Sequence, residues 1–163
     1  TFNAFAAEAD PYFGTVKKIV MGDGIMQAYD DLGYGDVAPQ AILAHEYGHH
    51  VQFAKDVIFE YSPEGTMRTE LMADAFAGYY LTHKQGAALN WKRVQEFLSV
   101  FYSIGDCAFE NPNHHGTPNQ RMKAAKFGYS TANDAQKKGK ILKAEDFITL
   151  FDEVYASITA PDA

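Results

Sequence analysis

The sequence predicts one mostly helical α+β domain over residues 1–163, with a small sheet at its N-terminal end. The 163-residue chain is 47% hydrophobic, which is enough to fill a single core. Apolar residues recur at helical spacing over most of the chain after residue 38, whereas only two short segments before it resemble strands. No repeat, low-complexity tract or linker divides the sequence. We therefore expect helices to dominate a single compact unit.

The elements are expected in the following order. Short strands are predicted at 3–7 and 16–21, the second ending at a Gly22-Asp23-Gly24 turn, and a short helix at 25–32 is stopped by Gly33 and Gly35. Pro39 suits the first turn of a helix over 39–55, with Asp36 as its candidate cap. Further helices are predicted at 66–84 with Thr66 or Ser62 as cap, at 90–104, from Pro118 to Gly128, and at 144–158.

Two histidines in the 39–55 helix form the main functional motif. His45 and His49 are four positions apart, so both imidazoles leave one face of a helix and can bind one metal ion. Glu46, displaced around the helix, can reach a water bound to that metal. This HExxH pattern suits Zn²⁺ with a carboxylate general base, as in metallohydrolases. Gly48 would let another element or a substrate approach the helix closely. The alternative is a surface helix that carries these residues by chance.

Catalytic zinc usually has three protein ligands and one open position, and the 66–84 helix offers the third. Glu70 and Asp74 are four apart on a face that is otherwise small or apolar. Two acids packed inward are costly unless they coordinate or hydrogen-bond something. Glu70 as a metal ligand, with Asp74 accepting the N–H of a ligand histidine, would satisfy both. A solvated acidic face is the alternative.

These residues resemble known families. HExxH followed by a helical ExxxD is similar to the gluzincin zinc peptidases, and residues 45–52 and 70–78 are similar to the bacterial neutral zinc metallopeptidase family. The segment 115–121, His-Gly-Thr-Pro-Asn-Gln-Arg, and the segment Asn3-Ala4-Phe5-Ala6 resemble further parts of that family. The resemblance implies a minimal zincin-like domain, with two zinc-bearing helices and an N-terminal edge strand able to hold an extended peptide.

His115 and Arg121 complete the candidate site. The resemblance implies that His115 lies across the active site and helps to stabilise the transition state, whereas composition alone favours a solvated loop histidine. Arg121, one turn into the following helix, could orient His115 or bind a substrate carbonyl, and the alternative is a surface charge.

Together these residues predict a zinc-dependent metallopeptidase, with Zn²⁺ held by His45, His49 and Glu70 and with Glu46 as general base. His115 would contact the oxyanion. One alternative is a catalytically silent zinc-binding or interaction domain, which would not need a free base beside the metal. Another is a zinc hydrolase that acts on a non-peptide amide.

Composition limits the partners. A formal charge of −7 and the lack of a basic patch argue against nucleic acid, and the resemblance to zinc peptidases implies a peptide or protein substrate. No apolar run approaches 18 residues, so no membrane-spanning segment is expected in this chain. The chain begins at Thr1 rather than Met, which indicates a trimmed product with a targeting segment upstream. The single Cys107 leaves the compartment open, and the oligomeric state is open too.

Overall fold

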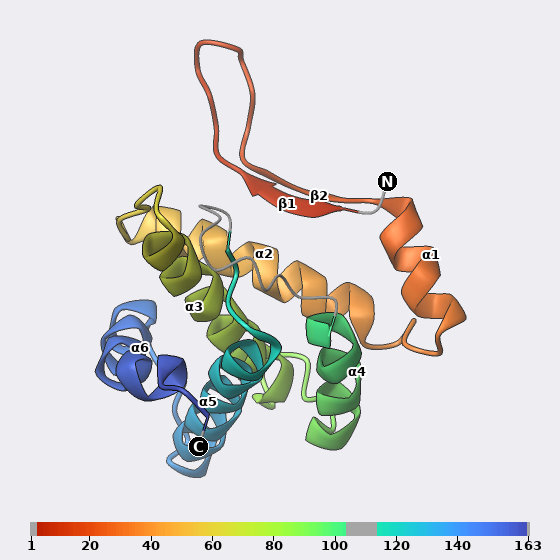
Figure 1. Cartoon of the computed structure of the whole chain (residues 1–163), viewed down its shortest axis with the longest axis vertical. Helices are drawn as coiled ribbons and strands as arrows, with labels where there is room; N and C mark the ends of the chain where they lie inside the picture. Colours follow the sequence, from red (N-terminus) through yellow and green to blue (C-terminus); the bar gives the residue numbers. More distant parts are fainter. Residues whose placement is uncertain (1–2, 104–113, 163) are drawn as a thin grey trace.

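The computed structural model describes residues 3–103 and 114–162, and confirms the predicted fold class (Figure 1). A two-stranded antiparallel sheet of β1 (Ala4–Ala7) and β2 (Lys18–Met21) pairs Ala4 with Met21 and Ala7 with Lys18. Six helices follow in the described residues: α1 (Asp23–Asp31), α2 (Ala38–Ala54), α3 (Pro63–Thr82), α4 (Trp91–Ser103), α5 (Pro118–Lys137) and α6 (Ala144–Thr159). In Figure 1 the sheet lies along one side of α2, α4, α5 and α6 lie on the other side, and α1 lies beyond one end of α2.

The helix ends show which of the predicted caps are used. Ser62 caps α3, because its hydroxyl accepts the backbone N–H of Gly65 at 3.0 Å. The prediction that Asp36 caps α2 is wrong. Val37 occupies the cap position without a side-chain cap bond, and the Asp36 carboxylate instead accepts a hydrogen bond from Arg93 at 2.9 Å. Pro39 lies in the first turn of α2, as expected.

The predicted end of α5 at Gly128 is also wrong, since the helix continues to Lys137. Gly128 lies where α5 crosses α3, and a Cβ added there would overlap the carbonyl oxygen of Ala75. Gly78 on α3 makes the reciprocal contact, since its Cβ would overlap the carbonyl oxygen of Ala125. The glycine inside α5 therefore marks a close helix crossing, which outweighs its helix-propensity cost of about 1 kcal/mol.

Gly48 has the same role between α2 and α3. A Cβ at this position would lie 3.2 Å from the Cα of Ala73, so the small residue lets the two helices approach closely, as the sequence predicted. Through these crossings α3 contacts both α2 and α5 (Figure 1). Residues from all three helices can therefore meet around the middle of α3.

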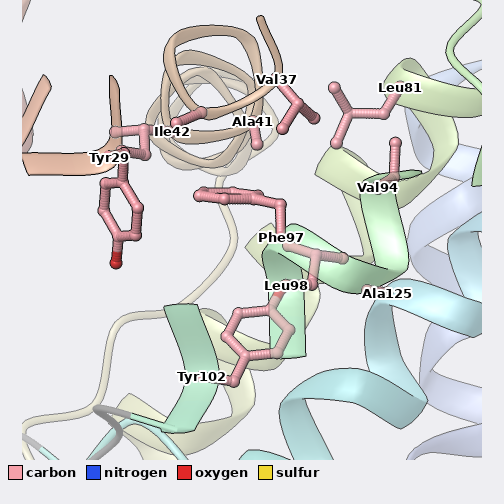
Figure 2. Close-up of a cluster of buried hydrophobic side chains, with 11 residues drawn as sticks. Tyr29, Val37, Ala41, Ile42, Leu81, Val94, Phe97, Leu98, Tyr102 and Ala125 are labelled. Carbon is pink, nitrogen blue, oxygen red and sulfur yellow. The ribbon is translucent and has the colours of Figure 1, made fainter. Parts of the chain in front are cut away.

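Two apolar clusters hold this arrangement. The first joins α1, α2 and α4 with Leu81 of α3 and Ala125 of α5, and the ring of Phe97 in α4 faces Ala41 of α2 (Figure 2). The second joins α3, α5 and α6, and its buried members are Leu71, Met72, Ala75, Ala124, Phe147, Phe151 and Ile158. None of the helices in the described part of the chain is long and apolar enough to cross a membrane.

Candidate metal centre

Helices α2 and α3 bring together the three predicted ligands. Donor atoms of His45, His49 and Glu70 all lie within 4.8 Å of one another. The Nε2 atom of His45 lies 3.1 Å from one Glu70 carboxylate oxygen, and Nε2 of His49 lies 3.3 Å from the other. Two imidazole nitrogens and a carboxylate converging at this range could hold one metal ion.

The other ring nitrogen of His45 is bound by a buried ion pair. Nδ1 of His45 donates to Asp74 at 2.9 Å, and Asp74 accepts two further hydrogen bonds from Arg121, at 2.8 and 2.9 Å. Asp74 is 1% exposed and Arg121 6% exposed. The guanidinium also lies over the ring of Tyr102, 4.4 Å from its centroid. A buried carboxylate on Nδ1 fixes the ring orientation and directs Nε2 toward the site.

Arg121 therefore acts on His45 through Asp74, and part of its side chain also lines the cavity over the ligands. The alternative of a surface charge is wrong, because the side chain is buried. Both described hydrogen bonds of the guanidinium go to Asp74, so Arg121 does not orient His115 through them. Long-range packing of α5 on α3, which local sequence does not encode, produces this pairing.

His49 has an outer partner that the sequence analysis missed. The side chain of Gln52 is fully buried, and its Nε2 donates to the backbone carbonyl of Thr69 at 2.7 Å. This bond leaves Gln52 Oε1 facing His49, where it accepts from Nδ1 at 2.9 Å. In a neutral ring, a proton held on Nδ1 by this bond leaves the lone pair of Nε2 available to a metal. The sequence did offer one signal for this contact: Gln52 is an amide three positions after His49, on the buried side of the helix.

The electrostatics follow from these contacts. Burial opposes protonation of His45, but the hydrogen bonds from its ring to Asp74 and Glu70 outweigh it and raise its pKa to about 10. Burial likewise opposes ionisation of both acids. Even so, hydrogen bonds from His45 and His49 hold the pKa of Glu70 well below its ordinary value, and the charge of Arg121 and the ring of His45 lower that of Asp74. Both acids are therefore carboxylates at neutral pH.

A cavity of about 490 Å³ opens over the ligands. Glu46, which is 8% exposed, lines it next to the ligand histidines. His115 also lines the cavity, with its side chain 46% exposed and Nδ1 3.9 Å from Glu70. Residues 3–6, including all but the last residue of β1, form another part of the wall. The remaining wall is largely apolar, formed by Ile25, Ile42, Phe53, Phe59 and Phe101.

The structure thus gathers all seven predicted residues at one place. Six of them line the cavity, and Asp74 lies behind His45. Chemically, the arrangement offers two imidazoles and a carboxylate for a divalent ion, a second carboxylate beside them, and a further histidine in the cavity wall. This set can hold a metal and move a proton at the same point.

Two uncharacterized bacterial proteins are similar to this chain. Rv2575 of Mycobacterium tuberculosis H37Rv is 30% identical over 159 residues, covering 78% of this chain and 54% of that protein. YpfJ of Escherichia coli K12 is 29% identical over 134 residues, covering 66% of this chain and 47% of that protein. The chain spans about half the length of the curated relatives it matches. No family model and no solved structure matches it.

Proposed function

We propose that this protein is a zinc-dependent metallopeptidase of the gluzincin type. The observation that carries the proposal is the pairing of both motif histidines. Each Nδ1 is occupied by a buried acceptor, Asp74 for His45 and Gln52 for His49, which directs both Nε2 atoms toward Glu70. A surface helix carrying HExxH by chance has no reason to orient both rings in this way.

The donor set suits zinc. Two imidazole nitrogens and one carboxylate oxygen form a three-ligand set, which in catalytic sites leaves a fourth position for water. A structural site closes that position with a further Cys or His. His115 lines the cavity, but its Nδ1 lies 3.9 Å from Glu70, and it lies outside the three-residue cluster. The open cavity over the ligands is where a substrate carbonyl would enter.

Bound Zn²⁺ would supply a Lewis acid that lowers the pKa of a water and polarises the scissile carbonyl. Glu46 would accept the proton of that water and deliver it to the leaving amine, which frees the amine and restores the carboxylate. His115, which lines the same cavity as Glu46, would donate a hydrogen bond to the developing oxyanion. Asp74 and Gln52 would keep the ligand rings fixed meanwhile.

An extended peptide would bind along β1. Within the described residues β1 pairs only with β2, and residues 3–6 of this region line the cavity. Strand addition would give backbone hydrogen bonds that do not depend on the substrate sequence, while the apolar wall contacts its side chains.

The decisive test compares wild type with Glu46→Gln for bound zinc and for cleavage of casein. Because Glu46 moves protons without binding the metal, the variant should hold one zinc per chain and lose activity by about 10²–10⁴-fold. Glu153→Gln is the matched control, since it makes the same change at an exposed position on α6. His45→Ala should lose the zinc.

Full activity in zinc-loaded Glu46→Gln would refute the assigned base. Zinc binding without cleavage by wild type would favour the silent zinc-binding domain, and hydrolysis of small non-peptide amides alone would favour the other hydrolase. A folded wild type that takes up no zinc would refute the proposal as a whole.

A further inference from the structure

We propose that the tip of the β1–β2 hairpin, residues 11–16, inserts into the surface of a phospholipid bilayer. The connection between the strands, drawn in red-orange in Figure 1, extends away from the helices. Every residue from 11 to 18 is exposed. This proposal does not depend on the metal centre.

The tip presents large apolar side chains to solvent. Tyr12 is 86% exposed, Phe13 74% and Val16 70%, and the two rings contact each other edge to face with centroids 5.0 Å apart. Aromatic side chains gathered on a projecting tip indicate an interaction site, because their exposure to water does not stabilise the fold. Tyr and Phe are also side chains that favour the interface of a bilayer.

Several backbone groups of the tip form hydrogen bonds within the hairpin itself. Asp10 and Thr15 exchange both backbone hydrogen bonds, at 3.2 and 2.9 Å. One carboxylate oxygen of Asp10 accepts the backbone N–H groups of Tyr12, at 2.9 Å, and Phe13, at 3.4 Å. A segment entering an apolar layer must pair backbone donors internally, and this turn pairs those of Tyr12, Phe13 and Thr15 while its two rings are exposed.

The charges favour a lipid surface over an apolar protein pocket. Lys17 and Lys18 follow the tip directly, and both are exposed. They would lie level with lipid phosphates when the rings are buried, and the hydrocarbon stems of lysine suit that position. Glu8, whose carboxylate lies 3.5 Å from Lys17, and Asp10 balance the two lysines, so residues 8–18 bring no net formal charge to the lipid surface, whereas the chain as a whole carries −7. A projecting turn of this shape can insert into a bilayer, because the bilayer surface deforms around it.

The test is cosedimentation of the full chain with vesicles of phosphatidylcholine and of an equal mixture with phosphatidylglycerol. Wild type should bind both. Tyr12→Ser with Phe13→Ser should lower the partition coefficient by at least about tenfold for each ring removed. The control, Leu32→Ser with Ile141→Ser, removes two other exposed apolar side chains, 62% and 58% exposed, and should bind like wild type.

Two further variants locate the contact. Lys17→Gln with Lys18→Gln should weaken binding to the phosphatidylglycerol mixture by about fivefold per lysine, and weaken binding to phosphatidylcholine less. Phe13→Trp, made in a Trp91→Phe background so that it is the single tryptophan, should shift its emission to shorter wavelength when vesicles are added.

The proposal is overturned if wild type binds neither vesicle, if the tip variant binds as well as wild type, or if the Phe13→Trp emission does not move. It is equally overturned if the tip variant changes only the oligomeric state in the absence of lipid, because the tip would then contact another copy of the chain.

Discussion

Replacing Gln52 by Leu should release His49 from its fixed orientation while the rest of the fold stays intact. The change keeps the side-chain volume but removes the acceptor on His49 Nδ1 and the donor to the Thr69 carbonyl. Leaving the imidazole N–H buried and unpaired costs about 1–3 kcal/mol, and the lost bond to Thr69 costs about 1 kcal/mol. Free to rotate or to change tautomer, His49 should lower zinc affinity by about 10–100-fold.

Zinc affinity is measured by competition with a chromophoric chelator, and stability by urea unfolding of chelator-treated protein. Gln52→Glu supplies the sharper control, because it keeps an acceptor for His49 but cannot donate to Thr69. Its zinc affinity should stay at or above that of wild type while its stability falls. Gln95→Leu, at an exposed position of α4, should change neither quantity. Wild-type zinc affinity in Gln52→Leu would refute the reasoning, as would parallel losses of affinity in the Leu and Glu variants.

Three other perturbations test the surrounding structure. Asp74→Ala leaves Arg121 buried without its partner and should lower the free energy of unfolding by about 3–5 kcal/mol, measured in urea; adding Arg121→Met should recover part of the loss. Gly128→Ala should lower stability by about 1–3 kcal/mol, although alanine favours helix, because its Cβ meets the Ala75 carbonyl; an unchanged melting temperature would contradict this. In the metal-free protein the pKa of His45 is raised to about 10, so its charged ring stabilises the fold fully below pH 6.5. The free energy of unfolding, measured in urea, should therefore fall as the pH rises from 6.5 toward about 10, and a value that stays constant over this range would refute the prediction.

Local periodicity was enough to predict the inner part of the site. The spacing of His45 and His49 places both rings on one face of any helix, and the same rule puts Glu70 and Asp74 together. Their convergence then required only that two adjacent helices pack through these faces. Gly48, read as a point of close approach, indicated where this happens.

The outer part of the site depended on contacts that local rules do not encode. Arg121 meets Asp74 from 47 positions away, through a helix crossing that the sequence pattern interpreted as a helix end. Gly128 could signal either a stop or a close approach, and only the position of the neighbouring helix decides between them. Gln52 was missed for a different reason, because its spacing alone does not show that the amide is buried or which groups it bonds.

The counter-charge of the site comes late in the chain. All three ligands and Asp74 precede Arg121, so a ribosome makes the donor set well before the cation that neutralises the carboxylate behind it. Until α5 packs on α3, Arg121 does not bind Asp74, and the carboxylate that orients His45 is not held in place. A nascent chain ending before α5 would thus carry the motif without its finished geometry. For the peptidase proposed above, hydrolytic capacity would be withheld until synthesis has reached the last third of the domain.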